Sequence, residues 1–167
     1  MRSFRQIDLS RLRELLEYDP ETGIFTRRVN AGSRGKAGDR AGTLDAGSGY
    51  RIIRIDGVNH AEHRLAWLYV YGELPIEVDH KDLDRSNNRI GNLRLCTRPQ
   101  NCANTFARSS SKIGIKGVSL HRKSGLYAAR ITVDGKPTSL GYHRTPELAG
   151  AAYAEAAKRI FGDFART

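Results

Sequence analysis

A carboxylate, an imidazole and two carboxamides in the middle of the chain have the types and the spacing for metal-assisted hydrolysis of a phosphodiester. Asp79 and His80 are adjacent, Asn92 follows twelve residues after the histidine, and Asn101 follows nine residues after that. Hard cations such as Mg²⁺ take oxygen ligands and keep several waters, so Asp79 and Asn101 could hold one. His80 has an ordinary pKa near neutrality and could take a proton from water, and the metal would stabilise charge on the leaving oxygen.

Two short strands and a helix are expected to position these side chains. Segment 76–78 reads as a strand, 81–91 as a polar loop and 92–95 as a second strand. Thr97 is the expected N-cap of the helix that carries Asn101. Adjacent strand residues point to opposite faces. Asp79 and His80 can therefore act at one place on the substrate only if the strand ends there or if the scissile phosphate lies between them.

The sequence DH, then NNRIGNLR, then QNCAN resembles the HNH endonucleases, in the branch found in phage and in intron-encoded homing enzymes. The resemblance implies a ββα-metal fold in which His80 is the general base, Asp79 and Asn101 bind the metal, and Asn92 braces the loop through backbone hydrogen bonds. The last family position is often histidine. Asparagine still allows an oxygen ligand, and Asn104, one helical turn further on, is the rival for that role. The ordered set favours a catalytic role over a purely structural one.

The residues ahead of this motif read as alternating helices and strands. Helices are predicted over 8–17 and 60–71, strands over 24–29 and 50–55, and a hairpin turn at Asp56-Gly57. The stretch HRLAWLYVYGELP also resembles the lead-in of phage HNH proteins. We therefore expect one nuclease unit over residues 1–104, with its core motif at 76–104.

Three features near the motif have structural interpretations beside functional ones. His63 is interpreted as a structural helix residue rather than a further catalytic group. Asn87 and Asn88 read as turn residues of the loop. The glycine-rich loop 30–49, which includes Arg34, fits a mobile connection and a segment that follows phosphates equally well.

Positive charge is concentrated in the last third of the chain. Residues 105–167 carry 11 basic and 4 acidic side chains, whereas residues 1–77 carry 12 and 11. Such a basic segment favours a polyanion as partner, nucleic acid above all, over a surface kept basic for solubility. The sequence shows no run of about 18 apolar residues and no apolar signal-peptide core, so we expect no membrane partner and a location in the cytoplasm, that of the host cell if the protein is phage-encoded. Cys96 and Cys102 lack the spacing of a zinc site or a disulfide framework and are expected to be reduced packing residues.

A second unit is predicted after a Ser-rich linker over 105–114. Strands are expected over 115–121, 126–133 and 137–143, with a hairpin turn at Asp134-Gly135. Thr145 and Pro146 begin a helix that ends near Phe161, with an apolar stripe that can cover the sheet. The alternation in 126–133 leaves Arg130 and Thr132 on the exposed face.

The segments KGVSLH, GLYAARITVDGK and SLGYHRTPELAGAAYAEAAKRIFGDFA resemble the AP2/ERF DNA-binding domain. The resemblance departs from the family at Tyr127, where the family usually has Trp, so the base preference of plant members does not carry over. A small basic sheet can enter the major groove of DNA. The residues expected to contact DNA are Arg94, Arg98, Lys116, Ser119, His121, Arg122, Lys123, Arg130, Thr132 and Ser139.

The sequence therefore predicts an α+β protein, with an N-terminal ββα-metal nuclease unit and a C-terminal three-stranded antiparallel sheet packed against one helix over 115–167. The expected function is a homing-type DNA endonuclease that uses Mg²⁺ or Mn²⁺, acts on double-stranded DNA as a monomer and takes no small-molecule substrate. The alternatives are a non-catalytic, sequence-specific DNA-binding regulator and an HNH nuclease that serves phage DNA packaging or restriction. Divalent-ion-dependent nicking of a plasmid separates a nuclease from a regulator.

Overall fold

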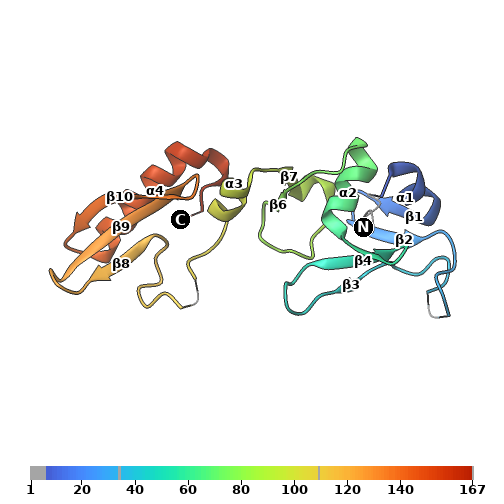
Figure 1. Ribbon diagram of the computed structural model, residues 1–167, viewed down its shortest axis with the longest axis horizontal. Helices are drawn as coiled ribbons and strands as arrows, with labels where there is room; N and C mark the ends of the chain where they lie inside the picture. Colours follow the sequence, from blue (N-terminus) through green and yellow to red (C-terminus); the bar gives the residue numbers. More distant parts are fainter. Residues whose placement is uncertain (1–6, 34, 109, 167) are drawn as a thin grey trace, which may run out of the picture. The chain divides into compact units, whose positions relative to one another are not determined.

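The computed structural model describes residues 7–33, 35–108 and 110–166 and divides them into two compact units (Figure 1). The first unit is Met1–Leu95 and the second is Cys96–Thr167. The sequence placed the boundary after Asn104. The structure differs because the short helix before that residue packs with the C-terminal elements. Among the described residues, no helix is long and apolar enough to cross a membrane.

The first unit contains two helices, seven short strands and one 3-10 turn among its described residues. In chain order these are α1 (Leu9–Leu15), β1 (Leu16–Asp19), β2 (Ile24–Arg27), β3 (Thr43–Leu44), β4 (Arg51–Ile55), β5 (Val58–Ala61), α2 (Glu62–Tyr71), β6 (Val78–His80), η1 (Ile90–Asn92) and β7 (Leu93–Leu95). The strands form three antiparallel sheets, with the orders β1-β2, β3-β4-β5 and β6-β7. The core of the unit contains fully buried side chains from α1, β1, β2, β4 and α2, namely Leu12, Leu16, Phe25, Ile53 and Leu65.

Local sequence rules explain most boundaries of this unit. Asp8 caps α1 by accepting from the Arg11 backbone N–H at 2.7 Å. Asp56 and Gly57 both have positive φ, 48° and 83°, as the two-residue hairpin between β4 and β5 requires. Gly72 ends α2 in the left-handed conformation, and its N–H bonds the Leu68 carbonyl.

Two helix boundaries and one loop differ from the sequence prediction. The first helix ends at Leu15 because Leu16–Asp19 pairs with Ile24–Arg27 as a strand. The second helix starts at Glu62, two residues later than expected, because β5 continues to Ala61 in its pairing with β4. The loop 30–49 is tied back to β2, since the Arg27 N–H donates to the Asp39 carbonyl at 2.9 Å. Arg34 of that loop lies outside the described residues.

The second unit is a three-stranded antiparallel sheet with helices beside it. It comprises α3 (Arg98–Ala103), β8 (Val118–His121), β9 (Leu126–Val133), β10 (Lys136–His143), α4 (Pro146–Phe161) and η2 (Gly162–Phe164), and the strand order is β10-β9-β8. α4 covers one face of the sheet (Figure 1). Thr145 caps α4 through its hydroxyl, with Pro146 at the first helical position, as predicted.

The alternation in β9 places the residues as the sequence predicts. Ala129 and Ile131 are buried against α4, whereas Arg130 and Thr132 are exposed on the other face. Ile160 does not belong to the buried stripe of α4, because it is 40% exposed and Ala157 takes the inward position.

One cysteine differs from its expected role. Cys102 is exposed and Cys96 is half-buried, so Cys102 is not the packing residue that the sequence indicated.

Candidate active site

The β6–β7 hairpin carries the acid and the imidazole. Asp79 and His80 are part of the strand, paired with Arg94 and Leu93, and the strand therefore extends two residues beyond the predicted segment. Both side chains are 3% exposed. Because successive strand residues point to opposite faces, the two side chains meet different partners.

Asp79 is held by an arginine on the neighbouring strand. Its Oδ2 accepts from Arg94 Nε at 2.8 Å and from Arg94 Nη2 at 2.7 Å. The Arg94 side chain is itself only 18% exposed. The sequence placed Arg94 at a DNA phosphate. In the structure its guanidinium is the charge partner that makes a buried carboxylate tolerable.

His80 is oriented by a loop asparagine. Its Nε2 lies 3.0 Å from Asn88 Oδ1. An amide oxygen can only accept, so Nε2 carries the proton and Nδ1 carries the lone pair. Burial lowers the pKa of His80, although the Asn88 hydrogen bond and the nearby Asp82 partly oppose that shift. A lowered pKa favours the neutral imidazole, the state that a general base needs.

Asn88 is the site residue that sequence reasoning missed. It reads as one of two turn asparagines, yet it is 1% exposed. The β1–β2 hairpin contacts its backbone, because Tyr18 Oη donates to the Asn88 carbonyl at 2.7 Å. A Cβ at Gly23 would lie 2.5 Å from the Asn88 carbonyl carbon, so only glycine allows this close approach. In the sequence, its position inside the motif NNRIGNLR is the feature that sets Asn88 apart from an ordinary turn asparagine.

A buried polar cluster continues behind His80. The His63 ring lies edge-on to the His80 ring at 5.0 Å between centroids, and burial lowers the pKa of His63 to about 3. Glu62 is fully buried and accepts from Arg51 Nε at 3.0 Å, while burial raises its pKa. Within the described chain, His63 Nδ1, Glu62 Oε1 and Asn88 Nδ2 have no hydrogen-bond partner. His63, interpreted from the sequence as a structural histidine, is buried and lies beside the candidate base, and its structural role stays a prediction.

Asn92 braces the loop between the two strands. Its Nδ2 donates to Asp82 Oδ1 and to the Asn87 carbonyl, both at 2.9 Å, and its Oδ1 accepts from the Asp82 backbone N–H at 3.2 Å. The contacts with the Asn87 carbonyl and the Asp82 N–H are backbone hydrogen bonds of the kind that the HNH resemblance implies for this position. The loop is thereby held against the hairpin that carries His80.

The remaining motif residues lie on α3, in the second unit. Thr97 and Gln100 form a reciprocal capping box at its start, in agreement with the predicted N-cap. Asn101 and Arg98 lie on this helix, and Asn104 is its C-cap residue, 4% exposed. The joint role of Asp79 and Asn101 as metal ligands stays a prediction.

The donor chemistry suits a hard divalent cation. A carboxylate and a carboxamide oxygen are ligands that Mg²⁺ and Mn²⁺ accept. Residues 7–33, 35–108 and 110–166 contain no group of three or more His, Cys, Asp or Glu side chains that could bind a metal.

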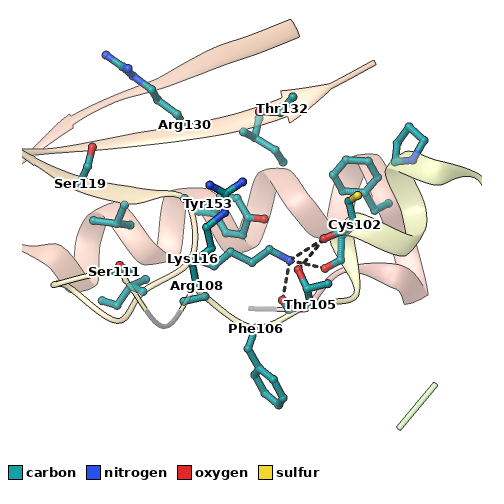
Figure 2. A pocket seen from close by; sticks show the side chains of 18 of the residues that line it. Cys102, Thr105, Phe106, Arg108, Ser111, Lys116, Ser119, Arg130, Thr132 and Tyr153 are labelled. Carbon is teal, nitrogen blue, oxygen red and sulfur yellow. Dashed lines mark hydrogen bonds between the residues drawn. The ribbon is translucent and has the colours of Figure 1, made fainter. Parts of the chain in front are cut away.

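Five of the predicted DNA-contacting residues line one pocket of about 700 Å³ in the second unit (Figure 2). They are Arg98, Lys116, Ser119, Arg130 and Thr132. Lys116 differs from the others because its ammonium is hydrogen-bonded to backbone carbonyls of residues 102, 103 and 105. The lining of the pocket therefore combines cationic and hydroxyl side chains with apolar side chains such as Ile115 and Ile131.

The other predicted DNA contacts lie outside this pocket. Arg122, Lys123 and Ser139 are exposed. His121 is half-buried, its Nδ1 lies 2.8 Å from Ser124 Oγ, and its ring packs edge-on against Tyr142.

Comparison with known proteins places the motif in a recognised class. Residues 60–103 match the family model of the HNH endonuclease, a span that begins at the end of β5 and includes both β6–β7 and α3. This match covers about a quarter of the chain and suggests DNA endonuclease activity for that segment.

A relative is found in a phage. The chain is 26% identical to Protein 3.8 of Escherichia phage T7 over 106 residues. The aligned region covers 62% of this chain and 87% of that protein. No solved structure matches the chain.

Proposed function

We propose that the chain is a metal-dependent DNA endonuclease of the homing type, in which His80 is the general base. The observation that carries the proposal is the state of His80 inside the HNH-matching segment. Its imidazole is buried, and its Nε2 lies 3.0 Å from Asn88 Oδ1, an acceptor that favours the proton on Nε2. Nδ1 is then the atom that takes a proton from the attacking water.

The neighbouring residues have supporting roles. Asp79 and Asn101 would hold Mg²⁺ or Mn²⁺, and Asn92 keeps the loop in place. Arg94 fixes the Asp79 carboxylate by two hydrogen bonds to one oxygen. When bound, the metal supplies stabilisation of the negative charge on the leaving oxygen of the phosphodiester.

The second unit would anchor the enzyme on duplex DNA. Its three-stranded sheet leaves Arg130, Thr132 and Ser119 exposed, away from the packed helix, which supports a surface for DNA there. Residues 105–167 also hold most of the excess positive charge. Phosphate contacts of this kind make binding strong and dependent on salt.

His80→Ala tests the proposal. The purified variant and the parent are incubated with supercoiled plasmid in Mg²⁺, with and without EDTA, and their affinity for the same DNA is measured by gel retardation. We expect the parent to nick plasmid only with the divalent ion, and His80→Ala to bind DNA without cutting it. Cleavage by His80→Ala at the parent rate would overturn the assignment of the base. Retarded bands with intact plasmid for the parent would indicate a DNA-binding regulator.

A further inference from the structure

The side chain of Lys116 lies across the C-terminal end of α3. Its Nζ donates to the carbonyls of Ala103 at 2.5 Å, Thr105 at 2.8 Å and Cys102 at 3.4 Å (Figure 2). The last carbonyls of a helix have no partner within the helix, and a cation near them also complements the helix dipole. Lys116 thus closes this end of α3 as the capping box closes the other.

Helix α3 depends on such contacts for its position. It has six residues, too few to be stable in isolation. Other contacts at this end include the Thr105 hydroxyl, which donates to the Cys102 carbonyl at 2.8 Å, and the Arg166 N–H, which donates to the Ala103 carbonyl at 3.2 Å. The helix also packs against α4 and η2. The orientation of the side chains on α3 is therefore set from outside the helix.

The backbone of Lys116 is itself fixed to the sheet. The next residue, Gly117, has φ of 73°, and a Cβ there would lie 2.1 Å from the Tyr153 ring. The Gly117 carbonyl accepts from the Arg130 N–H at 2.8 Å. Lys116 therefore projects from a tightly packed edge of the sheet, and its ammonium ties α3 to that edge.

We propose that Lys116 is a positioning residue for Asn101, and that it does not bind a DNA phosphate. By locking the end of α3 to the sheet, it keeps the carboxamide one turn earlier in the orientation that a metal ligand needs. The inference rests on the proposed nuclease function. Lys116 would also couple the helix that bears the proposed metal ligand to the sheet that is expected to bind DNA.

Lys116→Met removes the donor and keeps the apolar stem. Lys158→Met is the matched control, because Lys158 is exposed on α4 and its loss changes the net charge equally. We expect Lys116→Met to raise the half-saturating Mg²⁺ concentration for single-turnover cleavage about tenfold, the usual scale for lost support of a metal ligand. Affinity for DNA and its salt dependence should match those of Lys158→Met. Lys116→Arg, which can still donate to the carbonyls, should restore most of the Mg²⁺ response.

Amide hydrogen exchange gives a readout independent of cleavage. In Lys116→Met we expect faster exchange confined to the amides of residues 98–104. Combined with Asn101→Ala, Lys116→Met should add little further loss of cleavage, because both changes act through one group. If Lys116→Met unfolds the chain, the milder Lys116→Gln must show the same Mg²⁺ shift to a smaller degree.

Two results would overturn the proposal. The first is an unchanged Mg²⁺ response together with unchanged exchange in α3. The second is weaker DNA binding with a salt slope smaller by about one and a normal Mg²⁺ response, which is the signature of a lost phosphate contact. Failure of the parent to cleave DNA would refute the nuclease function instead, and the exchange experiment would still test the role of Lys116 in holding α3.

Discussion

Replacement of Asn88 by alanine is the most direct test of how the site is built. The substitution removes the acceptor of the His80 Nε2–H and leaves a buried donor without its bond. An unsatisfied buried donor costs about 1–3 kcal/mol. If the misoriented imidazole raises the activation free energy of cleavage by that amount, cleavage slows about five- to 150-fold, since about 1.4 kcal/mol corresponds to tenfold.

The assay is single-turnover nicking of supercoiled plasmid at saturating Mg²⁺, with the melting temperature measured in parallel. Asn87→Ala is the control, because Asn87 is the adjacent asparagine but is only half-buried, and its side chain donates to Asp82 at 2.6 Å rather than accepting from His80. We expect Asn87→Ala to cut within about twofold of the parent rate. A folded Asn88→Ala that cuts as fast as the parent would refute the inference that Asn88 orients the base. Equal losses in both variants would instead point to the integrity of the loop.

Four further outcomes are expected. Arg94→Met should destabilise the chain by about 3–5 kcal/mol in urea denaturation, because the buried Asp79 carboxylate loses the charge and the hydrogen bonds of the Arg94 guanidinium; a loss below about 1 kcal/mol would contradict this. Gly117→Ala should lower the melting temperature markedly, since its φ is 73° and an added Cβ meets the Tyr153 ring; an unchanged melting temperature would show that the sheet edge is loosely packed. Arg130→Ala should weaken binding to all duplex sequences and reduce the salt slope by about one, as measured by titrations at several salt concentrations; a sequence-dependent loss would indicate base contact instead. The folded chain holds His63 neutral down to pH about 3, whereas the unfolded chain protonates it below about 6.5. Stability should therefore fall as the pH drops through that window, by up to about 1.4 kcal/mol per pH unit, and His63→Phe should flatten the slope in denaturation series at pH 7, 6 and 5.

Local chemistry made much of the fold predictable. Asp56-Gly57 and Asp134-Gly135 are turns that need positive φ at both residues, and all four adopt it. Thr97 caps its helix through the hydrogen bond that its type suggests. Such features depend on residues within a few positions of each other, so their signal is contained in short segments of sequence.

The parts that the sequence did not predict depend on distant contacts. Leu16 continues an apolar helical pattern, but pairing with Arg27 makes it the start of a strand. Asn88 becomes buried because Tyr18 and Gly23, more than sixty positions earlier, close over its backbone. In both cases tertiary packing overrides the local preference.

The contact between the β1–β2 turn and the loop of the motif bears on attempts to make a smaller nuclease. Beyond Tyr18 and Gly23, the Pro20 carbonyl accepts from the Ile90 N–H at 3.1 Å, and the Glu21 carbonyl accepts from Arg89 Nε at 2.8 Å. None of these four groups belongs to residues 60–103, the span matched by the family model. A fragment trimmed to that span, or grafted onto another scaffold, would keep Asp79, His80, Asn92 and Asn101 but lose the contacts that hold Asn88, the partner of its histidine.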